Sequence, residues 1–170
     1  MRPRSTFALG QAVLAASILL AAAEPATAGP KRVSMLSKFD QSAVERARAG
    51  AARKLQEPEC QKVLEDFRDR EGRPLRQSLE KWGMSAAEYV QMIPFLDGSS
   101  HRLCLWSKVE LVSSPGTPRV YVCGRFATTQ VREPGLAEAM VIHEMLHTLG
   151  LGENPPTSVE ITQRVKGRCG

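Results

Sequence analysis

The sequence predicts an α+β fold with a helical N-terminal half, a β-hairpin or small sheet, and then two more helices. Apolar residues recur at helical spacing as far as Pro94. Strand-forming residues then flank a segment rich in serine, proline and glycine, and helical spacing returns at Pro134. Helices, a hairpin and further helices in this order indicate α+β rather than alternating α/β. The four cysteines predict that disulfide bonds staple this fold.

Residues 1–28 are typical of a secretory signal peptide. Arg2 and Arg4 precede an apolar stretch, and Ala26-Thr27-Ala28 supplies the small residues of a cleavage site. The stretch is short for a membrane span, which needs about 20 apolar residues, although a retained anchor is the alternative. We therefore expect a secreted or periplasmic monomer of residues 29–170, forming one compact domain with a flexible leader over 29–38.

The charge of the expected mature chain is mildly basic and spread along the sequence. Loss of Arg2, Arg4 and Glu24 lowers the net charge from +5 to +4. Aromatic residues are few and are not interleaved with basic ones, so no stacking platform for bases is expected. No second long apolar run follows the signal peptide. These features exclude a nucleic-acid-binding protein and a membrane-spanning one.

Several short helices are expected before Pro94. Their predicted ranges are 42–56, 58–72, 75–82 and 85–94. Ser42-x-x-Glu45 and Ser85-x-x-Glu88 are capping-box signals for the first and last of them. Pro58 suits the first position of the second helix, and Gly83 is a stop signal for the third.

A β-hairpin is expected from strands over 102–112 and 119–126, joined by 113–118. Cys104 and Cys123 flank this hairpin and could meet across it. Cys60 and Cys169 would then join an early helix to the last residues. Three pairings are possible, and we expect this one. No cysteines are spaced as C-x-x-C, which argues against a cysteine-ligated zinc site.

The strongest predicted helix of the mature chain runs from Pro134 or Gly135 to His147, with Gly150 as its stop signal. A last short helix is expected over 158–166, opened by the capping-box pattern Thr157-x-x-Glu160.

The helix before Gly150 contains His143-Glu144-Met145-Leu146-His147. Residues four apart share one face of a helix, so the two imidazoles can bind one Zn²⁺. Glu144 can reach the water on that zinc without binding the metal, and can act as the catalytic general base. The alternative is a buried, hydrogen-bonded histidine pair with Glu144 on a solvated face.

The run from His143 to Glu153 reads H-E-x-x-H-x-x-G-x-x-E and resembles the zincin metallopeptidases. Its spacing is similar to the metzincin branch, H-E-x-x-H-x-x-G-x-x-H, although no methionine follows Met145 here. The resemblance implies one zinc per chain, with Glu153 in the third-ligand position and Gly150 turning the chain. It also implies peptide-bond hydrolysis by a zinc-activated water, with the substrate extended along an edge strand within 102–126.

Three other residues are weaker candidates for the site. Glu160 is the rival third ligand, an arrangement that resembles the gluzincin branch, although capping of its own helix also explains its position. His101 could be a distal ligand or proton donor, or an exposed loop histidine. Tyr121 could stabilise an oxyanion, or pack in the core as a strand aromatic.

The sequence therefore favours an exported zinc metalloendopeptidase acting on a peptide or protein, including cell-envelope peptides. The alternative is an exported, disulfide-stapled binding or envelope protein with a structural zinc or none. Whether residues 29–57 form a pro-segment across the cleft stays open.

Overall fold

The structure is a computed structural model that describes residues 35–106 and 108–170. The predicted signal peptide, and the predicted leader as far as residue 34, lie outside the described residues. The described part is mixed α+β, as predicted, with helices around a small three-stranded sheet. No helix of the described part is long and apolar enough to cross a membrane.

The helices of the described residues are short apart from three. Their bounds are α1 (Lys38–Lys54), α2 (Pro58–Gln61), α3 (Val63–Asp66), α4 (Arg76–Trp82), α5 (Ala86–Met92), α6 (Arg102–Trp106), α7 (Phe126–Arg132), α8 (Pro134–Thr148) and α9 (Ser158–Cys169). The starts of α2 and α8 at proline, the capping boxes of α5 and α9, and the end of α4 before Gly83 are as predicted.

Helix α1 begins earlier than the sequence predicts. Its cap is Ser37, whose hydroxyl accepts a hydrogen bond from the backbone N–H of Asp40, so the predicted cap Ser42 lies inside the helix. The predicted leader therefore overlaps the helix at Lys38. Small residues form the buried face of α1, and at Gly50 a β-carbon would collide with Glu138 of α8. This small-residue face lets α1 and α8 approach closely.

The helix predicted over 58–72 is wrong in its second half. The chain forms α2 and α3 and then becomes extended at Phe67. The carboxylate of Asp69 accepts hydrogen bonds from the backbone N–H groups of Glu71 and Arg73, and Gly72 takes a positive φ of 78°. This side-chain-to-backbone bonding favours a turn over helix. The result is a loop over 67–74 that projects from the helices.

The sheet contains the predicted hairpin and one strand that the sequence patterns miss. Its strands are β1 (Phe95–Asp97), β2 (Leu111–Ser114) and β3 (Thr117–Val122), in the order β1-β3-β2. Strands β2 and β3 are antiparallel, and β1 pairs in parallel with β3. The first predicted strand begins too early, because residues 102–106 form α6, and the second ends too late, because a turn follows Val122 and Phe126 begins α7. The predicted loop over 113–118 is too long, since β2 continues to Ser114 and β3 begins at Thr117. A five-residue segment such as α6 is too short for periodicity to separate helix from strand.

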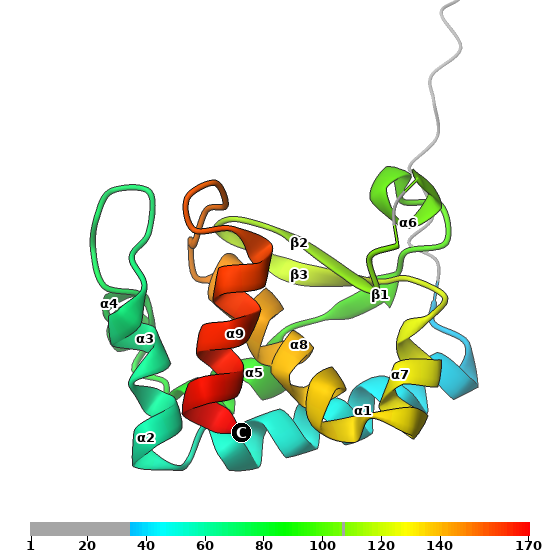
Figure 1. The fold of residues 1–170 in the computed structure, drawn as a ribbon, viewed down its shortest axis with the longest axis horizontal. Coiled ribbons are helices and arrows are strands. Elements are labelled where there is room, and N and C mark those ends of the chain that lie inside the picture. Colours follow the sequence, from blue (N-terminus) through cyan, green and yellow to red (C-terminus); the bar gives the residue numbers. More distant parts are fainter. Residues whose placement is uncertain (1–34, 107) are drawn as a thin grey trace, which may run out of the picture. The chain divides into compact units, whose positions relative to one another are not determined.

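Helix α8 is the centre of the packing (Figure 1). It contacts β2 and β3 on one side, α1 and α7 on another, and α9. All residues from Val141 to Thr148 are buried. A helix segment that is buried on every side is usually apolar on every face. The histidines and glutamate of this segment therefore lie in the interior, where their polar atoms need partners.

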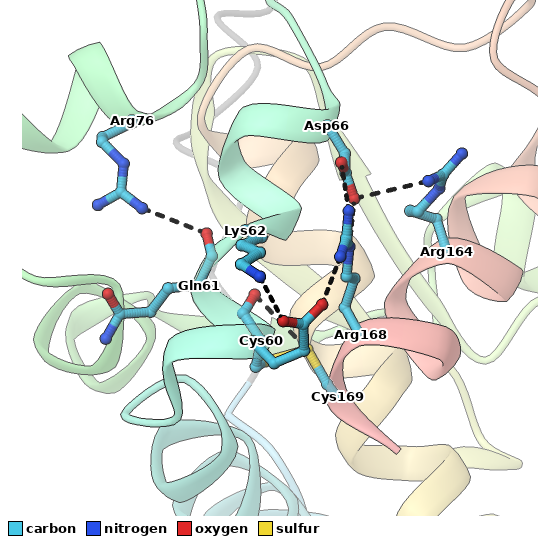
Figure 2. A network of polar contacts seen from close by, with 9 residues as sticks. Cys60, Gln61, Lys62, Asp66, Arg76, Arg164, Arg168 and Cys169 are labelled. Carbon is cyan, nitrogen blue, oxygen red and sulfur yellow. Dashed lines mark hydrogen bonds and ion pairs between the residues drawn. A yellow bond between two sulfur atoms is a disulfide. The ribbon is translucent and has the colours of Figure 1, made fainter.

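Both predicted disulfides are present, Cys60–Cys169 and Cys104–Cys123. The first joins α2 to the last turn of α9, where Arg168 also pairs with Asp66 and Glu59 (Figure 2). The hydrogen bond from Arg168 lowers the pKa of the Asp66 carboxyl. Lys54 donates a hydrogen bond to the Cys169 carbonyl at 2.6 Å. Together these contacts fix the C-terminal end of α9 to α1, α2 and α3.

We predict that removing Cys60–Cys169 destabilises the fold more than removing Cys104–Cys123. The two bonds close separations of 109 and 19 residues. Loop-closure entropy then makes the first loss larger by about 1.5 kcal/mol. The free energy of unfolding of the two double Cys→Ser variants, measured in urea without reductant, checks this. Equal losses, or the reverse order, would contradict it.

Candidate metal centre

The two histidines of α8 face one another inside the fold. His143 and His147 are four residues apart, so their side chains lie on one face of the helix. Their Nε2 atoms are 3.0 Å apart, and each side chain is 7% exposed. Burial, with a smaller contribution from His147, lowers the pKa of His143 to about 3. His143 is therefore a neutral imidazole at ordinary pH, which is the form that binds metals.

The second ring nitrogen of each histidine has its own partner. Nδ1 of His147 lies 2.8 Å from the carbonyl oxygen of Leu151, and Nδ1 of His143 lies 2.9 Å from the hydroxyl of Thr162 in α9. A carbonyl only accepts hydrogen bonds, so Nδ1 of His147 carries the proton and its Nε2 offers a lone pair. Such bonds orient metal-binding histidines and raise their basicity.

Glu153 reaches the histidine pair through a tight turn after α8. Gly150 has a φ of 116°, and a β-carbon there would lie 3.1 Å from Cβ of Asp69, so glycine is required on two grounds. The next residue, Leu151, bridges to Asp69 of the 67–74 loop. Oε1 of Glu153 then lies 3.2 Å from Nε2 of His147 and 3.7 Å from Nε2 of His143.

The three donor atoms fit a single metal ion. They lie 3.0, 3.2 and 3.7 Å from one another. Donors of a tetrahedral zinc with bonds of about 2.0–2.1 Å are about 3.3–3.4 Å apart. The side chain of Glu153 is 40% exposed, so the cluster opens to solvent on its side. His143, His147 and Glu153 can thus hold a metal ion and leave one position accessible.

Glu144 is buried beside this cluster without belonging to it. Its Oε2 accepts a hydrogen bond of 2.6 Å from the hydroxyl of Ser113 in β2. Burial raises the pKa of the Glu144 carboxyl, and the hydrogen bond from Ser113 acts in the opposite direction. Ser113 therefore anchors the carboxylate of Glu144 through one of its two oxygens.

Glu160, the alternative candidate for the third ligand, does not lie beside the histidines. Glu160 is exposed, and its carboxylate accepts hydrogen bonds from the backbone and hydroxyl of Thr157 at the start of α9. These bonds lower the pKa of Glu160. Its capping role therefore accounts for its position, while Glu153 lies against the histidines.

The other two candidates lie together and do not belong to the cluster. The rings of His101 and Tyr121 are stacked with centroids 4.7 Å apart. Neither side chain is among those that line the cleft described next. Each has a packing partner that explains its position without a role in metal binding.

A cleft of about 440 Å³ opens over the cluster. His143, Glu144, His147 and Glu153 line it together with eight other side chains. These others are Arg70, Leu103, Val109, Leu111, Val112, Ser113, Pro115 and Ser158. Strand β2 forms one wall and is an edge of the sheet, because it pairs only with β3 among the described residues. The cluster thus lies beside a strand edge with unpaired backbone groups.

Sequence patterns do not identify Ser113, Thr162 or Arg70 as part of this site. Ser113 falls in the predicted hairpin loop, and Arg70 falls in a predicted helix that the structure replaces by a loop. Thr162 contacts His143 through its hydroxyl and lies on the following helix, and no sequence spacing relates these two residues. The expected Cys60–Cys169 bond fixes the end of the last helix against α2, but it does not identify Thr162 as a partner of His143.

Comparisons of the chain with protein-family models, with curated proteins and with solved structures find no match. The chemistry of the site is therefore inferred from its donor atoms and their surroundings.

We predict that Glu153→Gln weakens zinc binding by more than about 100-fold, beyond the loss expected when a residue only orients a ligand. An amide is a poorer donor than a carboxylate, whereas Glu160 only caps α9. Glu160→Gln should therefore keep the affinity of the unmodified chain. Competition with a chromophoric chelator measures both constants. Unchanged affinity in Glu153→Gln, or equal losses in both variants, would contradict the assignment.

Proposed function

We propose that the protein is an exported zinc metallopeptidase of the zincin type. The observation that carries the proposal is the convergence of three metal-binding atoms, from His143, His147 and Glu153, beside the buried carboxylate of Glu144 in one cleft. The resemblance of the run from His143 to Glu153 to the zincin motif supports the same activity. Glu153 would be the third protein ligand.

Zinc is the metal that this donor set fits best. Two neutral imidazoles and one carboxylate with an accessible fourth position are typical of catalytic zinc. When bound, zinc would supply a Lewis acid that lowers the pKa of water to about 7 and polarises the scissile carbonyl.

Glu144 would move the proton in the reaction. Its carboxylate lines the cleft, and because Ser113 holds Oε2, Oε1 is free to accept a proton from the attacking water. The water oxygen forms the new bond to the carbonyl carbon, and the C–N bond breaks. Glu144 then gives the proton to the leaving nitrogen, so the carboxylate is regenerated. Ser113 would be a positioning residue for Glu144.

The substrate would bind as an extended peptide along β2. The backbone groups on the side of β2 away from β3 are available for pairing, and Leu111, Val112 and Ser113 line the cleft. An added strand obtains affinity from backbone hydrogen bonds, and selectivity from side chains that alternate along it. A peptide bound in this way would have its scissile bond next to the metal cluster.

Export is supported by the two disulfides, which persist in oxidising compartments. The alternative of a structural zinc is less well supported, because structural sites are closed by four protein ligands. The cluster has three donors, and Glu153 is open to the cleft.

We predict that zinc-loaded Glu144→Gln loses peptide hydrolysis by about 10²- to 10⁴-fold, because an amide cannot accept the proton. Its zinc content should stay at that of the unmodified chain, since Glu144 is not a ligand. Glu80→Gln, on the exposed face of α4, is the matched control. Hydrolysis of a quenched fluorescent peptide library measures the rates. A fully active Glu144→Gln variant would refute the mechanism.

We predict that Ser113→Ala lowers kcat by about 10- to 100-fold, the value of one hydrogen bond to a charged group. Ser113→Thr keeps the hydroxyl and should recover most of the rate. Ser114→Ala removes the exposed neighbouring hydroxyl of β2 and should have no effect. If Ser113→Ala and Ser114→Ala have the same kcat, Ser113 does not position Glu144.

A further inference from the structure

The cleft contains one positively charged side chain, Arg70, that the proposed reaction does not use. Arg70 comes from the 67–74 loop and lines the cleft together with Glu153 and Ser158. A cation at this place can act on any substrate that lies across the cluster. Its position depends on how the loop is held.

The loop that carries Arg70 is fixed to the turn that carries Glu153. Asp69 bridges to Leu151, and the Asp69 carboxylate accepts backbone hydrogen bonds from within the loop. Gly152 lies beneath Arg70, since a β-carbon on this glycine would lie 3.9 Å from both Cγ and Nε of the arginine. The side chain of Arg70 therefore lies against the same turn that brings Glu153 to the histidines.

Arg70 has no acidic partner among the described residues, unlike Arg73 of the same loop and Arg168 of α9. Arg73 in the same loop pairs with Asp69 and Glu71, and Arg168 pairs with Asp66 and Glu59. Figure 2 shows Arg168 and Arg164 both directed at Asp66. No ion pair involves Arg70 anywhere in residues 35–106 and 108–170. A guanidinium without an internal partner is available to a carboxylate of a ligand, which it can bind through two parallel hydrogen bonds.

The cleft also has an apolar part. Leu103 of α6 and Val109 line it and are 50% and 38% exposed, and Leu111 and Val112 of β2 continue the apolar surface. An apolar side chain of a ligand would bury part of this exposed area. The cleft therefore offers both a cationic group and an apolar wall beside the metal cluster.

We propose that the cleft selects peptides with a carboxylate facing Arg70 and an apolar side chain against Leu103 and Val109. This inference rests on the proposed peptidase function and adds the class of its substrate. The carboxylate belongs either to an acidic side chain or to the C-terminus of the peptide, and the same arginine recognises both.

The test measures peptide binding to the zinc-loaded Glu144→Gln chain by fluorescence anisotropy. Four labelled peptides share one apolar sequence and differ in having Glu or Gln at one position, and a free or amidated C-terminus. We expect a peptide with the recognised carboxylate to bind about tenfold more tightly than its neutral partner. The Glu/Gln pair and the acid/amide pair then identify which carboxylate is recognised.

Substitutions of Arg70 assign the preference to its guanidinium. In the Glu144→Gln background, Arg70→Gln should remove the tenfold preference and Arg70→Lys should keep part of it. Arg132→Gln, at the exposed end of α7, is the matched control and should leave it unchanged. Equal binding of all four peptides, binding of none, or a preference that survives Arg70→Gln would each overturn the inference.

Hydrolysis by the unmodified zinc-loaded chain separates this inference from the proposed function. Cleavage of the peptides without any preference for the carboxylate would overturn the inference alone. An Arg70-dependent binding preference without cleavage of any peptide would support the inference about the ligand and refute the peptidase activity.

Discussion

The burial of polar side chains in the second half of α8 is the constraint on which the rest of the site depends. Two imidazoles and a carboxylate lose their hydration there, which costs free energy unless their polar atoms find partners. The partners come from three directions: Ser113 of β2, Leu151 of the following turn, and Thr162 of α9. The sheet edge, the turn and the last helix are therefore arranged around α8, and both Nε2 atoms are left for a metal.

Helix α9 contributes to the site because both of its ends are held. The capping box of Thr157 and Glu160 fixes its start, and Cys169 and Arg168 fix its last turn to α2 and α3 (Figure 2). Thr162 lies between these two attachments and keeps its contact with His143. The disulfide far from the cleft thus contributes to the orientation of a candidate metal ligand.

Much of this organisation could be predicted from local sequence, and the remainder depends on contacts between distant segments. The helix of His143 and His147, the turn at Gly150 and both disulfides follow from spacing and composition. The loop that replaces the end of the predicted 58–72 helix does not, because the side chain of Asp69 competes with the helical hydrogen bonds. Strand β1 is only three residues long and forms because β3 provides its partner. Neither feature has a periodicity to detect, and the first of them brings Arg70 to the cleft.

The most direct test of the central claim, a metal held by three protein donors with one accessible position, is X-ray absorption spectroscopy of the zinc-loaded, oxidised chain. We expect two imidazole nitrogens, one carboxylate and one exchangeable light-atom ligand at about 2.0–2.1 Å, with no sulfur. Addition of a small zinc-binding anion should change only the exchangeable ligand. A shell closed by four protein ligands, or a chain that does not retain zinc, would contradict a three-donor metal site with an accessible position.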